Sequence, residues 1–333
     1  MTIRKERTIF KIPKKVPNSQ DLLDRAFKRA SKSINLSFKP NTPSYIKARK
    51  RENYRIQVVN DYLINKLEEI VKSFPSIDNL HPFYNELLDI LVKKDTLKIN
   101  LGSLGGTIHI LKKIAKEIKS KIRKSNIPEE IARYRLHFYG RISSIIKKLN
   151  SQLIFLEECR YKFKKIPSFN IEGPVIVIAG YPNVGKSSLI RLISSAKPKI
   201  DYYPFTTKNL FVGHQVIKGT KFQIIDTPGL LDRSIDQRNN IELQAIIALK
   251  YLADKIIYIF DASGNSGYSI KDQLKLFNEL TELFSTIPII TCLNKIDLAT
   301  FDELSTDFLS KIQFKISTFT KEGIESLSKH IFI

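Results

Sequence analysis

The chain has 333 residues, of which 42% are hydrophobic and 26% charged, a composition typical of folded globular proteins rather than disordered ones. Its length exceeds what one hydrophobic core usually serves, so two domains are expected. No apolar run reaches the ~18–20 residues of a membrane span, and the first 15 residues lack the apolar stretch of a secretory signal. Cys159 and Cys292 match no metal-binding or redox spacing, which predicts buried thiols in a reducing cytoplasm.

The formal net charge of +22 is concentrated in the first half of the chain. Residues 1–170 hold 37 Lys and Arg against 16 Asp and Glu, whereas residues 171–333 are nearly balanced. This asymmetry predicts one domain that binds a polyanion and a second domain with a different task. We place the domain boundary between residues 170 and 171.

The first half of the chain carries helical signals. Its first 50 residues are rich in Lys, Pro, Ser and Asn, which predicts a segment that orders only against a partner. Apolar residues at helical spacing predict helices over 61–74 and 107–124. A third helix is predicted over 128–165, which opens with a proline and two glutamates. The glycine-rich stretch 101–110 is interpreted as a loop and helix start. These segments predict an all-α helical-bundle domain.

The pattern changes at a predicted linker over 166–174. From there on, short apolar runs alternate with helical segments; the runs cover 175–180, 211–217, 221–227, 255–263, 287–295 and 312–317. Continuous apolar strands separated by helices indicate a mostly parallel sheet that is covered on both faces. Residues 171–333 are therefore predicted to form a three-layer α/β domain with ligand loops at the carboxyl ends of its strands.

Residues 180–187 read GYPNVGKS and satisfy the pattern G-x-x-x-x-G-K-[ST] between a strand and a helix. Its glycines let successive N–H groups point at phosphate oxygens, and the helix N-terminus adds positive charge. The candidate phosphate-binding residues are Asn183, Val184, Gly185, Lys186, Ser187 and Ser188. We expect Lys186 to bridge the β- and γ-phosphates and the Ser187 hydroxyl to ligate Mg²⁺.

The sequence NKID, which ends the fifth strand run, predicts guanine as the base. Asp297 can accept hydrogen bonds from guanine N1–H and the 2-amino group, a donor pair that adenine lacks. The stem of Lys295 can lie across the base, and Asn294 can tie this loop to the phosphate loop. After the last strand run, Ser317 and Thr318 are expected to bring a backbone amide to guanine O6. The predicted ligand is therefore GTP or GDP.

A third motif, Asp-Thr-Pro-Gly, ends another strand run. Asp226 is expected to hold Mg²⁺ through water, and the Gly229 N–H to sense the γ-phosphate. Between this motif and the phosphate loop, Thr206 and Thr207 each offer a hydroxyl to Mg²⁺, and we favour Thr207. These segments are expected to become ordered around the γ-phosphate and to loosen after its loss.

Together these motifs resemble a translation-factor-related GTPase. The stretches PNVGKSS, DYYPFTTKNLFVGH and DTPGLLD, with the basic helical leader, resemble the nucleolar GTP-binding protein 1 family of the Obg-like group. The stretch RISSIIKKLNSQLIFLEECRYKFKKIPSF is similar to that family's last helix before the GTPase domain. Eukaryotic members continue for a long region past the point where this sequence stops, a pattern that fits an archaeal member. The resemblance implies a P-loop GTPase domain behind an all-α domain, and a role in assembling the large ribosomal subunit.

The resemblance also bears on hydrolysis. Leu230 stands where Ras-like enzymes carry the glutamine that orients the attacking water, so intrinsic hydrolysis is expected to be slow. Related GTPases with asparagine at the position of Asn183 hold a K⁺ ion beside the phosphates; alternatively, Asn183 only braces the loop. The candidate catalytic residues are Lys186, Thr207, Gly229 and Asn183.

The expected partners are large-subunit precursors, their rRNA, and ribosomal or assembly proteins. Basic and aromatic residues interleave over 132–141, which favours RNA as the polyanion. Two alternatives stay open, namely a membrane-surface GTPase and a protein-recognition GTPase whose basic charge is incidental. Because the apolar helix faces lack an aromatic belt, we expect no membrane partner; we also expect a cytoplasmic monomer.

Overall fold

The computed structural model describes residues 11–32, 36–164, 166, 173–195, 199–201, 210–226, 229–234, 238–298 and 304–333. These residues divide into two compact units. The helical unit comprises 11–77 and 91–164, and the α/β unit comprises the described residues from 166 onward together with 78–90. The expected boundary between residues 170 and 171 lies outside the described residues.

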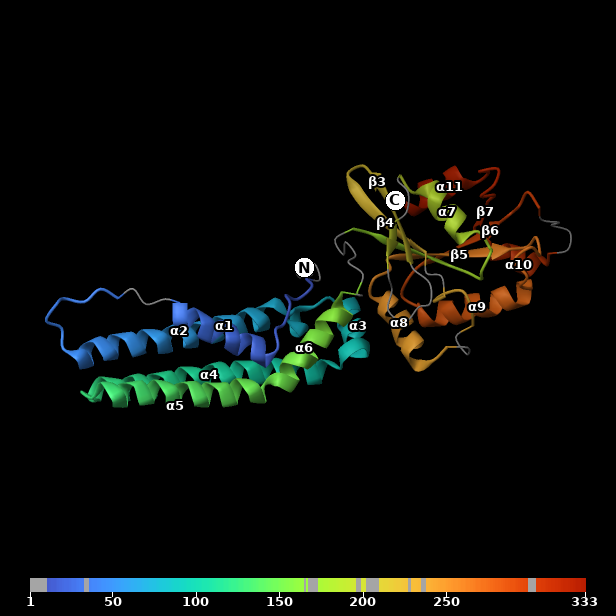
Figure 1. Ribbon diagram of the computed structural model, residues 1–333. Coiled ribbons are helices and arrows are strands. Elements are labelled where there is room, and N and C mark those ends of the chain that lie inside the picture. Colours follow the sequence, from blue (N-terminus) through green and yellow to red (C-terminus); the bar gives the residue numbers. More distant parts are fainter. Residues whose placement is uncertain are drawn as a thin grey trace, which may run out of the picture. The chain divides into compact units, whose positions relative to one another are not determined.

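The helical unit confirms the predicted all-α fold (Figure 1). Its helices are α1 (Ser19–Lys32), α2 (Ser44–Ser73), α4 (Lys94–Lys124), α5 (Pro128–Lys148) and α6 (Asn150–Phe163). A single 3₁₀ turn, η1 (Ile77–Asn79), and helix α3 (Pro82–Val92) lie between α2 and α4 in the chain. Within the described part of the chain, no helix combines the length and the apolar character that crossing a bilayer requires.

Helix α2 forms the centre of the helical unit, because it contacts α1, α4 and α5. Leu63 and Leu67 of α2 are fully buried, as are Leu111 and Ile118 of α4. Residues four and seven positions apart lie on one face of a helix, so each helix contributes one continuous apolar stripe to this core. The helices predicted over 61–74 and 107–124 are confirmed, although both begin earlier than expected.

The prediction for the first 50 residues was wrong over two stretches. Residues 19–32 form α1, and α2 already begins at Ser44. The apolar side chains of α1 are few and short, yet they fall on one face: Leu22, Leu23, Ala26 and Ala30 are buried. This stripe packs against α2 and α5 of the same chain. Residues 19–32 thus form an amphipathic helix, which their basic composition did not indicate.

The loop expected over 101–110 is also wrong, because these residues lie inside α4. Glycine costs about 1 kcal/mol relative to alanine in a helix interior, and Gly102, Gly105 and Gly106 disfavour the helix locally. Leu104 and Ile108, which alternate with these glycines, are buried against the rest of the bundle. Tertiary burial of about 1.5–3 kcal/mol for each large apolar side chain outweighs the local cost.

The single helix expected over 128–165 is two helices. It is interrupted at Leu149, whose N–H bonds to the carbonyls of Ile146 and Lys147. The apolar positions Leu153, Leu156 and Phe163 of α6 remain buried. The break therefore redirects the chain without exposing the apolar stripe.

The α/β unit is built on one seven-stranded sheet. Its strands are β1 (Val175–Ala179), β2 (Lys199–Asp201), β3 (Leu210–Ile217), β4 (Thr220–Asp226), β5 (Lys255–Asp261), β6 (Ile289–Asn294) and β7 (Phe314–Lys315). Its helices from residue 166 onward are α7 (Lys186–Ile193), α8 (Asn240–Lys250), α9 (Ile270–Leu283), α10 (Thr306–Ser310) and α11 (Ile324–Ile331). In Figure 1, α7 and α11 lie on one face of the sheet and α8 and α9 on the other, which confirms the three-layer α/β prediction.

The strand order is β2-β3-β4-β1-β5-β6-β7. Strands β4, β1, β5, β6 and β7 are parallel, whereas β3 runs antiparallel to β4 and β2 antiparallel to β3. Because parallel strands end at the same sheet edge, the residues that follow them gather there. This edge carries the carboxyl ends of β1, β4, β5 and β6, which are Ala179, Asp226, Asp261 and Asn294.

Candidate nucleotide-binding site

The loop between β1 and α7 turns sharply through three residues with positive φ. Gly180 has φ 135°, Asn183 has φ 63° and Gly185 has φ 104°. A Cβ atom on Gly180 would come within 2.5 Å of the Ile259 carbonyl oxygen, and one on Gly185 would collide with the amide nitrogen of Asn294. Both glycines are therefore required by backbone conformation and by close approach. The loop can present its N–H groups to an anion.

Lys186 and Ser187 begin helix α7 at the inner end of this loop. The Lys186 ammonium is buried and donates hydrogen bonds to the carbonyls of Gly180 and Tyr181, each at 2.7 Å. The Ser187 hydroxyl donates to the Asp226 carboxylate at 2.6 Å, and Asp226 is fully buried at the end of β4. The loop, β4 and α7 thus bring together one cation, one hydroxyl and one carboxylate.

A cavity of about 360 Å³ lies in front of these groups. It is lined by Pro182, Asn183, Gly185, Lys186, Ser187, Ser188, Asp226 and Asp232. Five of the six predicted phosphate-binding residues line this cavity, and the sixth, Val184, is fully buried and does not line it. The hydroxyl and carboxylate oxygens of Ser187 and Asp226 are of the kind that Mg²⁺ prefers, so these residues fit the ion.

Asn294, at the end of β6, links the phosphate loop to the loop after β7. Its buried amide donates to the Val184 carbonyl at 2.8 Å and to the Thr318 hydroxyl at 3.2 Å. Its carbonyl oxygen accepts the Thr318 N–H at 3.0 Å. The predicted tie between this strand end and the phosphate loop is present, and Thr318 is fixed by the same side chain.

Asp297 and Ser317 meet beside this link. The Ser317 hydroxyl donates to Asp297 Oδ1 at 2.5 Å and accepts the N–H groups of Phe319 and Thr320. This arrangement orients the Asp297 carboxylate and shapes the loop that follows Thr318. The two segments predicted to read a guanine base are therefore joined directly.

Lys295 adopts a left-handed backbone conformation, with φ 60°. Its ammonium pairs at 2.6 Å with Asp261, a buried carboxylate at the end of β5. Burial of Asp261 favours its neutral form, but hydrogen bonds from Lys295 and Ser263 outweigh burial and lower the pKa of Asp261. Asp261 was not predicted from the sequence, although an aspartate at the end of an apolar strand is itself a signal of a ligand-facing position.

The loop after β4 contains two residues that were not predicted from the sequence, Asp232 and Arg238. The Gly229 N–H donates to the Asp232 carboxylate at 2.7 Å, and the buried Arg238 guanidinium donates to the Gly229 carbonyl. Leu230 is buried, so its side chain is withdrawn from water as well as apolar. Thr206 and Thr207, predicted to contribute an Mg²⁺ ligand, lie outside the described residues.

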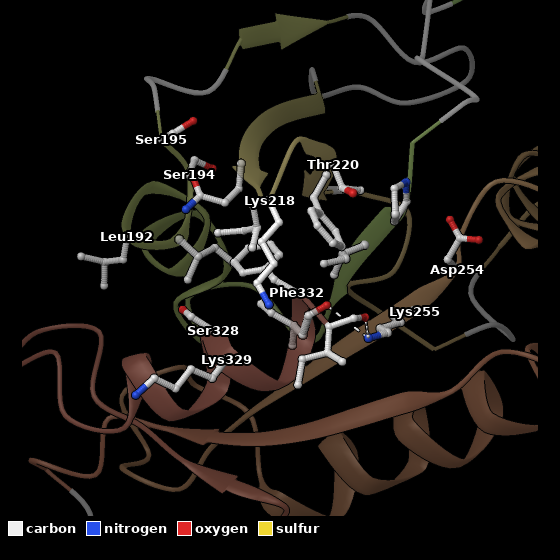
Figure 2. Close-up of a pocket in the computed structure, with 18 of the residues that line it drawn as sticks. Leu192, Ser194, Ser195, Lys218, Thr220, Asp254, Lys255, Ser328, Lys329 and Phe332 are labelled. Carbon is white, nitrogen blue, oxygen red and sulfur yellow. Dashed lines mark hydrogen bonds between the residues drawn. The ribbon is translucent and has the colours of Figure 1, made fainter.

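A larger cavity of about 960 Å³ lies near the amino ends of β1, β4 and β5 (Figure 2). It is lined by apolar groups such as Phe222 and Phe332 and bordered by Lys218, Lys255 and Lys329. None of the predicted site residues borders it. We therefore take the smaller cavity as the candidate nucleotide site, because it contains the buried Lys186 ammonium together with the hydroxyl of Ser187 and the carboxylate of Asp226.

Comparison with known families identifies both parts of the chain. Residues 10–170 match the NOG1 N-terminal helical domain, and residues 240–297 match the family model of nucleolar GTP-binding protein 1. An uncharacterized protein of Methanocaldococcus jannaschii is 38% identical over 288 residues, which cover 86% of this chain and 81% of that protein.

Eukaryotic relatives are longer than this chain. Nucleolar GTP-binding protein 1 of Drosophila melanogaster is 36% identical over 75% of this chain and 39% of its own length. The Saccharomyces cerevisiae protein of that name is 33% identical over 89% of this chain and 45% of its own length. The chain thus spans about half the length of these eukaryotic relatives or less.

Among solved structures, one described as nucleolar GTP-binding protein 1 from Plasmodium falciparum is 37% identical. It covers 50% of this chain and 87% of that one, with a TM-score of 0.43. The G domain of the T. maritima FeoB iron transporter is 26% identical over 48% of this chain and 96% of that one, with a TM-score of 0.38.

Proposed function

Because this chain belongs to the nucleolar GTP-binding protein 1 family, we propose that it is a GTP-hydrolysing switch that acts in assembly of the large ribosomal subunit. The observation that best supports a guanine nucleotide as the ligand is the direct link between the phosphate loop and the loop proposed to read the base. One side chain, Asn294, bonds both to Val184 of the phosphate loop and to Thr318 of the base-reading loop. A guanine nucleotide lying across this link would touch both segments.

In the proposed site, Asp297 accepts hydrogen bonds from guanine and Lys186 contacts the β- and γ-phosphates. Ser187 and Asp226 would hold Mg²⁺, with Thr207 as the proposed further ligand. When bound, the ion neutralises charge that develops on the phosphates during hydrolysis. The phosphate loop supplies fixed N–H donors to the same charge, an electrostatic contribution that needs no rearrangement during the reaction.

We propose a slow intrinsic hydrolysis rate that K⁺ raises. Leu230 is buried and offers no hydrogen bond to water. Asn183 lines the phosphate cavity, is exposed, and has a positive φ of 63°. Phosphate release measured in matched K⁺ and Na⁺ buffers tests this; equal rates in the two buffers would leave Asn183 as a loop brace.

The helical unit is the proposed rRNA-binding part of the protein. On α4, Lys113, Lys116 and Lys124 are exposed and, at these spacings, share one helix face. Cations spread along a rigid helix neutralise phosphates of a nucleic acid backbone, which gives salt-sensitive binding with little sequence preference. The buried, unpaired thiols of Cys159 and Cys292 fit the cytoplasm that we propose as the compartment.

Cosedimentation with purified large subunits and their precursors tests this proposal. The full chain is assayed with GDP and with a non-hydrolysable GTP analogue across a salt series. We expect preferential binding to precursors in the GTP-like state. Binding that survives nuclease treatment and ignores salt would favour a protein partner, and flotation with anionic liposomes would favour a membrane surface.

A triple variant tests whether the lysines of α4 contact the nucleic acid. Lys113→Gln, Lys116→Gln and Lys124→Gln together should weaken binding and lower the salt slope by about 2 to 3, one phosphate contact for each lysine. The matched control replaces three exposed lysines of the α/β unit, Lys221, Lys271 and Lys311, and should bind as the wild type does.

A further inference from the structure

Asp232 lies at an unexpected place in the candidate site. It is the third residue after Gly229 and lines the phosphate cavity together with Lys186, Ser187 and Asp226. The cavity therefore contains two carboxylates beside a single ammonium. Asp226 bonds to Ser187, the proposed Mg²⁺ ligand, whereas Asp232 bonds to a backbone donor of its own loop.

That donor is the N–H of Gly229. It points at Asp232 Oδ2 at a distance of 2.7 Å, and Gly229 has φ 85°. In the proposed function, the same N–H senses the γ-phosphate. A backbone amide carries one hydrogen, so a strong bond to Asp232 and a strong bond to a phosphate oxygen exclude each other.

Arg238 keeps the Asp232 carboxylate in place. Its guanidinium is completely buried and donates to the Gly229 carbonyl, to the Arg233 carbonyl at 3.3 Å and to Asp232 Oδ1 at 3.4 Å. Burial lowers the pKa of Arg238, but an arginine with nearby Asp232 stays protonated throughout the physiological range. One cation thus holds both ends of the loop from Gly229 to Arg233.

We propose that Asp232 discriminates between GDP and GTP by competing with the γ-phosphate for the Gly229 N–H. GDP lacks the third phosphate and leaves this hydrogen bond intact. GTP must displace the carboxylate and also approaches it with like charge, so its affinity is reduced relative to that of GDP. The inference rests on the proposed function, because it requires a guanine nucleotide in this cavity with its third phosphate near Gly229.

The experiment compares the affinities of the full chain for GDP and for GMPPNP, by isothermal titration calorimetry with Mg²⁺ present. Asp232→Asn removes the charge but retains an oxygen that can accept the Gly229 N–H. Asp232→Ala removes both. The quantity measured is the ratio of the GMPPNP affinity to the GDP affinity, and circular dichroism checks that each variant is folded.

We expect Asp232→Asn to raise this ratio about tenfold, which corresponds to about 1.4 kcal/mol, and Asp232→Ala to raise it at least as much. Asp307→Asn is the matched control, since its carboxylate is 80% exposed on α10; its ratio should equal that of the wild type. A ratio that is unchanged or falls in both Asp232 variants overturns the inference while the proposed nucleotide site stands. Failure of the wild type to bind GDP overturns both.

Discussion

Replacing Asn294 with alanine should uncouple the phosphate loop from the loop after β7, which we propose reads the guanine base. The side chain is fully buried at the end of β6 and makes three hydrogen bonds. Two of them engage backbone groups, the Val184 carbonyl and the Thr318 N–H, which alanine cannot satisfy. The change removes no large apolar group, so its effect reports on polar connections rather than on packing.

The expected loss of unfolding free energy follows from these bonds. A typical hydrogen bond contributes about 1 kcal/mol net, and a buried group left without a partner costs about 1–3 kcal/mol. With Val184 itself fully buried, its carbonyl is poorly placed to gain water after the substitution. We therefore expect Asn294→Ala to destabilise the α/β unit by about 3 kcal/mol and to weaken GDP binding as well.

The assay is urea unfolding of the full chain in a Phe319→Trp background. The sequence contains no tryptophan, and Phe319 is 87% exposed, so this substitution adds a fluorescent reporter to the α/β unit at little cost. At an m-value of about 2–3 kcal/mol/M, the urea midpoint should fall by about 1–1.5 M. Asn265→Ala, at an exposed position of the same unit, is the control. A loss below about 1 kcal/mol, or one equal to the control, would refute the reasoning.

Three further predictions concern the base, the acid limit and the helical unit. Asp297→Asn should lower GDP affinity at least a hundredfold, because the amide cannot accept both guanine donors; calorimetry with GDP and xanthosine diphosphate measures the change in preference. Asp261 has a lowered pKa, despite burial, through hydrogen bonds from Lys295 and Ser263, so it contributes stability above its unfolded pKa of about 3.9 and loses it as the pH falls through the folded value. The stability advantage of the wild type over Lys295→Met should therefore be full above about pH 5 and shrink below about pH 4 in urea titrations; an advantage independent of pH would contradict the assignment. Gly106→Ala should raise the thermal midpoint of the helical unit, with about 1 kcal/mol of stabilisation, since an added Cβ meets no atom within 4 Å; an unchanged or lower midpoint would show that the glycine is needed.

The nucleotide site was the part most open to prediction from sequence. Its chemistry depends on short motifs whose residues act within one turn or one strand end, as in the run from Gly180 to Ser187. The structure places these motifs at one sheet edge because parallel strands end there. The helices over 61–74 and 107–124 were equally accessible, since burial on one face leaves a period that can be read directly.

Local reasoning failed where distant contacts outweigh local preference. The glycines of α4 indicated a loop, but burial of Leu104 and Ile108 in the bundle favours the helix. The basic composition of the N-terminal segment indicated that it orders only against a partner, but α1, with its four small or aliphatic buried residues, packs against α2 and α5. In each case a few adjacent residues disfavour the helix locally, but burial of side chains against other helices stabilises it by more.

The sequence by itself determined the α/β and all-α classes and the position of the loop between β1 and α7, and it supplied the prediction that Asp297 reads a guanine base, because each is encoded in composition, period or a contiguous motif. Only the tertiary structure decided that Lys295 pairs with Asp261, that Asn294 also bonds to Thr318, and that the Asp232 carboxylate accepts the Gly229 N–H and pairs with Arg238. These pairings depend on which side chains the folded backbone brings within about 3 Å, and a hydrogen bond or ion pair depends on that distance rather than on separation along the chain.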